Sequence, residues 1–201
     1  MQKTTDSQQY YQQTCIQQLD CPVFSGEKSV DLCIIGGGLT GVSSAYHGAK
    51  AGLDCLLLEA EQIGFGASGR NGGQVSPGQR LDQASLEAKV GKAQAHKLWQ
   101  LALDSVDLVR DLIDKHQIPC DFTPGILHTA FKPSHAREMQ ENVQLLQKDY
   151  SYQDCRYIGQ DELKTMLASP RYYGGELDMR AGHLHPLNFT LGLARAAQQA
   201  G

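Results

Sequence analysis

A glycine-rich hexapeptide between two apolar segments constrains this sequence more than any other feature. Gly36-Gly37-Gly38-Leu39-Thr40-Gly41 follows the apolar run 29–35 (SVDLCII) and precedes 42–51, which is rich in small residues. A second apolar run, 53–59 (LDCLLLE), ends in Glu59. The order strand, glycine turn, helix and strand predicts a βαβ unit with the G-x-G-x-x-G fingerprint of dinucleotide binding.

The glycines of this motif have separate physical roles in holding a pyrophosphate. Gly36 permits the tight turn out of the strand, Gly38 lets the pyrophosphate approach the backbone, and Gly41 lets helix and strand pack closely. The helix start offers N–H groups and the positive end of its dipole to the phosphates. Glu59 is expected to accept hydrogen bonds from both ribose hydroxyls and to repel a 2′-phosphate, which favours FAD or NAD over NADP. The alternative, a turn with incidental glycines and a surface glutamate, leaves the flanking strand and helix unexplained.

A second glycine-rich loop follows at 64–74 (GFGASGRNGGQ). Its bare backbone suits close approach to a large flat ligand. Arg70 is a candidate partner for phosphate, and Ser68 and Asn71 are candidate hydrogen-bond donors. A flexible glycine loop is the alternative, but the position directly after the acidic strand end favours a second contact with the same dinucleotide.

The rest of the chain predicts further helices and strands. Residues 1–28 are polar and rich in Gln and Ser, and are expected to be a loosely ordered lead-in. Hydrophobic periodicity predicts the helices 83–116, 133–149, 161–168 and 186–200, and the strands 125–131, 155–158 and 174–179.

Composition excludes several classes of function. A formal net charge of −4 argues against a general nucleic-acid or membrane-surface binder. The sequence has no apolar run of about eighteen residues, so no membrane span is predicted. None of the six cysteines forms a C-x-x-C pair, and no secretory signal is present, which predicts reduced thiols in a cytoplasmic protein. His183 and His185 would share a face if they lay on a strand, but no carboxylate cluster accompanies them, so no metal site is predicted.

The motifs GGGLTG (36–41), LLLEA (56–60) and GFGASGRNGGQ (64–74) together resemble the D-amino-acid-oxidase-like family of FAD-dependent amine oxidoreductases. Within that family, the early YY (10–11) and DMRAGHLHPLNFTLGLARAA (178–197) resemble the members that oxidise gamma-glutamylated polyamines. The resemblance implies an α/β fold with a Rossmann-like FAD-binding domain and a substrate domain on a mixed or antiparallel sheet. The expected domains are a polar lead-in at 1–28, an incomplete FAD-binding domain at 29–118 and 182–201, and part of the substrate domain at 119–181.

The resemblance also implies which residues hold FAD. The first loop and the end of the second strand are expected at the adenosine and pyrophosphate, and the second loop along the pyrophosphate, ribityl chain or flavin. The predicted cofactor-binding residues are Gly36, Gly37, Gly38, Leu39, Thr40, Gly41, Glu59, Ala60, Ser68, Gly69, Arg70, Asn71, Gly72 and Gly73. The catalytic residues stay unassigned.

The implied reaction is oxidation of a primary amine or an amino-acid-like C–N bond by hydride transfer to the flavin. Gamma-glutamylputrescine is the candidate substrate, which implies a role in polyamine catabolism. The electron acceptor is oxygen or another molecule, and the sequence gives no oligomeric state. The resemblance implies a longer chain, so this sequence is expected to be an N-terminal fragment without activity of its own. Two alternatives stay open: an NAD-dependent dehydrogenase, against which the second loop argues, and a non-catalytic flavin-binding protein.

Overall fold

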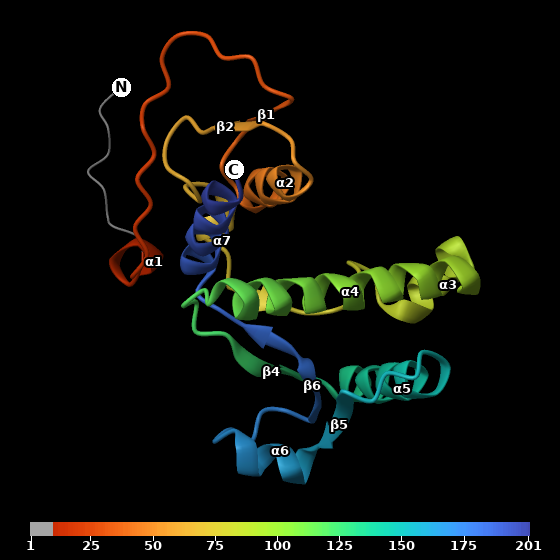
Figure 1. Ribbon diagram of the computed structural model, residues 1–201. Coiled ribbons are helices and arrows are strands. Elements are labelled where there is room, and N and C mark those ends of the chain that lie inside the picture. Colours follow the sequence, from red (N-terminus) through yellow and green to blue (C-terminus); the bar gives the residue numbers. More distant parts are fainter. Residues whose placement is uncertain (1–9) are drawn as a thin grey trace, which may run out of the picture. The chain divides into compact units, whose positions relative to one another are not determined.

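The structure, a computed structural model, describes residues 10–201 (Figure 1). Its chain divides into two compact units. The first unit combines the described residues up to Gly73 with Arg110–Phe122 and Leu184–Gly201, and the second combines Gln74–Val109 with Thr123–His183. An α/β fold with one parallel and one antiparallel sheet confirms the predicted fold class.

The first unit is built on a two-stranded parallel sheet. Its elements are α1 (Tyr10–Gln13), β1 (Leu32–Ile35), α2 (Leu39–Lys50), β2 (Cys55–Leu58), the 3₁₀ helix η1 (Ala67–Gly69) and α7 (Pro186–Ala200). β1 pairs with β2, and α2 is the connection between them. This arrangement confirms the predicted βαβ unit.

Packing between α2 and α7 forms the core of the first unit. On α2, small and apolar side chains such as Val42, Ala45 and Ala49 are buried, as the small-residue composition of this segment predicts. α7 is buried along much of its length, and Pro186 occupies its first turn, where a missing N–H costs nothing. The two helices thereby hold the end of β1 and the start of α2 in place.

The second unit is an antiparallel sheet covered by helices. Its elements are β3 (Gln74–Val75), α3 (Gln83–Val90), β4 (Thr123–Thr129), α5 (Pro133–Asp149), β5 (Cys155–Gly159), α6 (Gln160–Met166), β6 (Gly174–His183) and most of α4 (Lys92–His116). β6 pairs with β3, β4 and β5. The core joins Trp99 and Leu103 of α4 to Val143 and Leu146 of α5.

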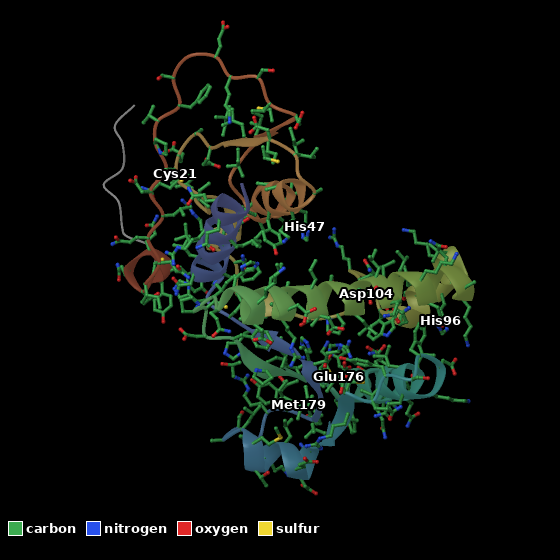
Figure 2. The ribbon with its side chains drawn as sticks, viewed as in Figure 1. Cys21, His47, His96, Asp104, Glu176 and Met179 are labelled. Atoms are coloured by element: carbon green, nitrogen blue, oxygen red, sulfur yellow. The ribbon has the colours of Figure 1, made fainter. Side chains whose placement is uncertain are left out.

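Two carboxylates on β6, the buried Asp178 and the partly buried Glu176, join this sheet to its surroundings. Asp178 accepts hydrogen bonds from Tyr152 Oη at 2.7 Å and from Arg180 N at 2.9 Å. Glu176, labelled in Figure 2, accepts from Asn142 Nδ2 of α5 at 3.3 Å, and burial raises the pKa of its carboxyl. These bonds fix α5 and the loop after it on β6.

Several predictions need correction. The single helix at 83–116 is wrong, because it breaks at Gly91, where φ is +80°. The last strand extends to His183, and His185 is the N-cap of α7, so the two histidines do not share a strand face. In the predicted lead-in, four residues are hydrogen bonded to α7: Cys15, Ile16, Gln18 and Asp20. Residues 1–9 of that lead-in lie outside the described residues.

Three short elements have no counterpart in the sequence predictions: α1, η1 and β3. None exceeds four residues, which is too short for a hydrophobic period to show. The proposed domain boundaries at 118 and 181 stay a prediction, because compactness alone does not assign a cofactor or a substrate to a unit.

Candidate FAD-binding site

Glu59 connects the end of β2 to the first glycine loop. Its Oε2 accepts a hydrogen bond from Gly37 N at 2.6 Å, and its Oε1 accepts one from Glu61 N at 3.0 Å. These backbone donors, Gly37 first, hold the pKa of the Glu59 carboxyl below its usual range. The carboxylate therefore stays charged at neutral pH, and each oxygen can accept a further hydrogen bond, as a ribose hydroxyl would require.

The first glycine loop turns directly from β1 into the start of α2. Gly36 has φ +105° and donates its N–H to Leu58 O at 2.7 Å. A Cβ on Gly41 would overlap the carbonyl oxygen of Gly36, so glycine is needed for α2 to start this close to the strand. Gly38, the N-cap of α2, has no side chain, and the first helical N–H, that of Leu39, donates to Ser68 Oγ instead. The start of α2 also presents the positive end of its dipole, which favours a phosphate.

Ser68 joins the second glycine loop to the first. Its Oγ accepts a hydrogen bond from Leu39 N at 2.9 Å, which leaves the hydroxyl proton available to donate. Gly64 N donates to Gly37 O at 2.9 Å, so a backbone bond joins the same two loops. The two glycine motifs, separate in sequence, thus form one continuous surface with Glu59.

Asn71 shapes its own loop. Its Nδ2 donates to the carbonyl oxygens of Ala67 at 3.1 Å and Ser68 at 3.0 Å, and its Oδ1 accepts from Gly73 N at 2.8 Å. The side chain predicted as a ligand donor is therefore engaged within the loop. The guanidinium of Arg70 lies 4.4 Å from the centre of the Phe65 ring, in a cation–π contact on an exposed side chain.

The other predicted residues differ in their exposure. Thr40, Ala60 and Gly72 are exposed, and Ala60 lines the hollow described next. Gly69 and Gly73 are buried, and their contact with the cofactor stays a prediction.

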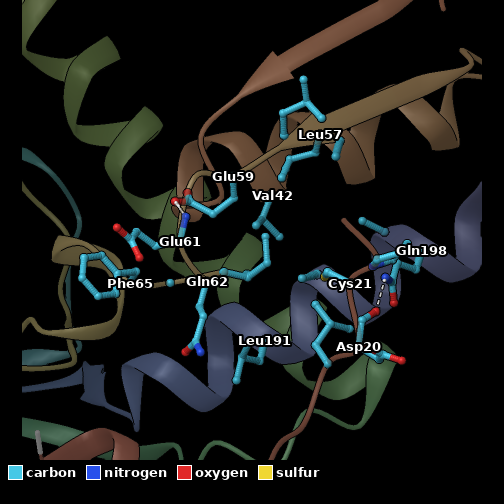
Figure 3. A pocket seen from close by; sticks show the side chains of 18 of the residues that line it. Asp20, Cys21, Val42, Leu57, Glu59, Glu61, Gln62, Phe65, Leu191 and Gln198 are labelled. Carbon is cyan, nitrogen blue, oxygen red and sulfur yellow. Dashed lines mark hydrogen bonds between the residues drawn. The ribbon is translucent and has the colours of Figure 1, made fainter. Parts of the chain in front are cut away.

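A large hollow runs beside β2 from the Glu59 loop toward the N-terminal segment (Figure 3). We name it the β2 hollow; its walls are β2, the loop 59–65, one face of α7 and residues 17–25. Its volume of about 1680 Å³ exceeds the range of roughly 300–1,000 Å³ common for small-molecule sites. In Figure 3, Glu59 and Glu61 lie at one end of the hollow, and Asp20 and Cys21 lie at the other.

The wall formed by the N-terminal segment was not expected from the sequence. Asn188 Oδ1 accepts from Ile16 N and from Cys15 Sγ, both at 3.1 Å. Gln18 O accepts from Arg195 Nη2 at 2.8 Å, and Asp20 O accepts from Gln198 Nε2 at 3.4 Å. We name residues 14–24 the strap. The strap's partners are more than 170 residues away in sequence, and no spacing rule connects them.

Residues 10–201 contain neither a candidate metal site nor a candidate membrane span. No group of three or more His, Cys, Asp or Glu side chains in that range is arranged to hold a metal ion. No helix in the same range combines the length and apolar character needed to cross a membrane.

Comparisons with known proteins agree with this geometry. The family model described as FAD dependent oxidoreductase (DAO) matches residues 31–201. The chain is 35% identical over 192 residues to a probable oxidoreductase, OrdL, of Haemophilus influenzae, covering 96% of this chain and 44% of that protein. It is 37% identical over 171 residues to gamma-glutamylputrescine oxidoreductase of Escherichia coli, covering 85% of this chain and 40% of that protein. The chain belongs to the DAO family of FAD-dependent oxidoreductases.

Solved structures show the same fold at low sequence identity. The L-amino acid deaminase of Proteus myxofaciens aligns with a TM-score of 0.73 at 20% identity, over 91% of this chain and 39% of that one. The glycine oxidase of Bacillus cereus aligns with a TM-score of 0.63 at 20% identity, over 86% of this chain and 46% of that one. The chain thus spans less than half the length of the relatives that it matches.

The residues of this chain fit FAD, the cofactor of the family. The glycine turn that leads into the start of α2 suits the pyrophosphate, and a charged carboxylate with spare acceptor capacity suits the ribose. The β2 hollow is large enough for the adenosine that would follow.

Proposed function

We propose that this chain binds FAD through its two glycine loops and Glu59, in a protein that oxidises a primary amine or an amino-acid-like C–N bond. The 2.6 Å hydrogen bond from Gly37 N to Glu59 Oε2 carries the proposal, because it brings the ribose acceptor onto the pyrophosphate loop. The family membership supports FAD over NAD as the ligand of this surface.

The predicted cofactor residues are proposed to bind different parts of FAD. The start of α2 and the backbone of the first loop hold the pyrophosphate, and Glu59 orients the ribose. Ser68 and Arg70 supply a hydroxyl donor and a cation further along the cofactor, while Asn71, Gly69 and Gly73 keep the second loop in shape. FAD, when bound, supplies the two-electron acceptor for the oxidation.

Gamma-glutamylputrescine is the substrate we propose, with a role in polyamine catabolism in the cytoplasm. This finer assignment rests on the resemblance of the chain to the Escherichia coli relative. Oxygen or another molecule would take the electrons from the reduced cofactor. The residues that line the substrate site stay unassigned.

Cofactor titration tests the proposed binding. The purified protein is titrated with FAD and separately with NAD, and quenching of flavin fluorescence and heat release are recorded. We expect saturable FAD binding and no NAD binding in the same concentration range. A protein that binds NAD and not FAD would instead be the dehydrogenase alternative.

Anaerobic reduction tests the proposed substrate. The FAD-loaded whole protein is mixed with gamma-glutamylputrescine, free putrescine, sarcosine or a D-amino acid, and flavin absorbance is followed. We expect bleaching by the gamma-glutamylated diamine. Bleaching by sarcosine or a D-amino acid alone would reject the polyamine assignment and keep the oxidoreductase class, and no bleaching by any amine would favour the non-catalytic alternative.

A further inference from the structure

The strap follows a defined path along α7. Asn188, whose side chain is 1% exposed, uses its Oδ1 to accept from Ile16 N and Cys15 Sγ. Gln17 is also buried, at 6% exposed, and its Nε2 would lie 3.2 Å from a Cβ placed on Gly192. The contact with Asn188 tolerates little displacement of the strap, because an unmatched buried acceptor costs about 1–3 kcal/mol. The path of the strap up to Asp20 is therefore set by α7.

Beyond Asp20 the strap turns apolar and becomes a wall of the β2 hollow. Pro22, Val23 and Phe24 all line the hollow, and all three are exposed. Val23 is 95% exposed and Phe24 is 44% exposed. Neighbouring apolar side chains in one exposed wall are typical of a surface that binds a ligand or partner.

The hollow connects this apolar wall to the proposed ribose contact. Glu59 and Ala60 line the same hollow as Pro22, Val23 and Phe24. A nucleotide whose ribose was held by Glu59 would have this space beside it for its base. A purine is flat and has an apolar face, and such bases stack on aromatic side chains.

We propose that Pro22, Val23 and Phe24 form the outer wall of the adenine end of the FAD site, with Phe24 as the stacking residue. This inference rests on the proposed function, because it takes FAD as the occupant. The cofactor site then includes a segment that precedes the first glycine motif in sequence, and FAD retention depends on the strap.

Binding measurements on four single variants test the wall. Phe24→Ser removes the ring, Phe24→Tyr keeps a flat ring, and Phe24→Leu keeps apolar bulk without the ring. Ile16→Ser is the matched control, because Ile16 lies on the same strap, is 68% exposed and is not part of the hollow. For each variant, the Kd of FAD, the inhibition constant of ADP as a competitor, and Tm without ligand are measured.

We expect Phe24→Ser to raise the Kd of FAD about tenfold or more, with a similar rise in the ADP inhibition constant. Phe24→Tyr and Ile16→Ser are expected to stay within about twofold of the wild type. If Phe24→Ser lowers Tm, Phe24→Leu replaces it, with the same expected direction.

Two results would contradict the proposal that Phe24 stacks on the adenine of FAD. One is an unchanged Kd of FAD in the variant without the ring. The other is weaker FAD binding with unchanged ADP binding, since ADP carries the adenosine and the diphosphate of FAD but no flavin. A wild-type protein that binds no FAD would contradict the proposed function itself. If the wild type binds FAD and the Phe24→Ser variant binds it with the same Kd, the proposed role of Phe24 is contradicted and the proposed function is not.

Discussion

At the residue scale, Glu59 combines a structural and a binding role in one carboxylate. It accepts backbone N–H groups from Gly37 and Glu61, which keeps the end of β2 on the first glycine loop. A surface glutamate without these donors would sample several rotamers and lose side-chain entropy on binding a ribose. The internal bonds thus preorganise the acceptor.

Replacing Glu59 is expected to weaken FAD binding. Glu59→Ala removes charge-assisted hydrogen bonds worth about 1.5–3 kcal/mol, or roughly 10- to 100-fold in Kd. The matched control is Glu61→Ala, which removes a neighbouring carboxylate from the hollow and keeps the backbone N–H that Glu59 uses. Isothermal titration with FAD checks the difference. Equal Kd values for the two variants would show that Glu59 does not bind the ribose.

His185 gives the first unit a pH-dependent stability. Its Nδ1 accepts from Asn188 N at 3.1 Å as the N-cap of α7, and its Nε2 lies 3.0 Å from Thr14 Oγ1. Burial lowers the pKa of His185, so the unfolded chain takes up a proton at a higher pH than the folded one. The stability from the neutral ring is therefore complete above about pH 6.5 and is lost as the pH falls through the folded pKa.

Melting curves between pH 5 and pH 7.5 check this sign. We expect the Tm of the wild type to fall on acidification, and His185→Asn, which keeps a capping side chain that does not titrate, to fall less. Part of the slope will remain, because burial also lowers the pKa of His116, which contacts Tyr46 Oη at 2.9 Å. Parallel curves for wild type and variant would rule out the contribution of His185.

The sequence identified most of the candidate site at this scale, since glycines, Glu59 and Ser68 are chemically distinctive. It did not reveal that Asn71 is engaged within its own loop, because the same side chain serves a turn or a ligand equally well. It also missed Asn188, whose role depends on a partner from the opposite end of the described chain.

At the element scale, the ends of helices are predicted correctly where a proline begins the helix and wrongly where a glycine interrupts it. α5 and α7 begin at Pro133 and Pro186, and both have the predicted bounds, because proline suits the first helical turn. The predicted helix over 83–116 fails because apolar residues recur on both sides of Gly91 and conceal the break. Hydrophobic periodicity predicts which side chains share an apolar face, but it does not predict where the helix backbone ends.

Substitution of Gly91 distinguishes a broken helix from a continuous one. In a continuous helix, Gly→Ala stabilises by about 1 kcal/mol. Gly91 instead has φ +80° and ψ 153°, a conformation that costs a residue with a Cβ about 1–3 kcal/mol. We therefore expect Gly91→Ala to lower the free energy of unfolding in urea. A stabilised variant would show that α3 and α4 merge in solution.

At the scale of the whole molecule, the chain covers 40–44% of the length of two curated relatives. The parallel sheet within residues 10–201 has two strands, and Ile35 of β1 is 80% exposed. Parallel sheets in α/β proteins are usually buried on both faces, and two strands give little independent stability. The 201 residues therefore hold the cofactor loops on an incompletely covered sheet.

We expect the 201-residue polypeptide to bind FAD without sustaining amine turnover. The cofactor loops and Glu59 are present and preorganised, whereas none of the described residues has been assigned to a substrate contact. Fluorescence titration with FAD and an anaerobic assay of flavin reduction by amines measure the two properties separately. Steady turnover by this polypeptide would show that the substrate site is already complete.

The bond between Ile16 N and Asn188 joins residues 172 positions apart, which makes the order of synthesis important. The second unit ends at His183, so all of its segments have left the ribosome before α7 does. The strap, made first, has no partner until α7 emerges. Contacts of such long sequence separation form slowly, because the entropy of closing the loop is lost before any contact forms. The first unit is therefore expected to fold after the second, although the strap is synthesised before any segment of the second unit.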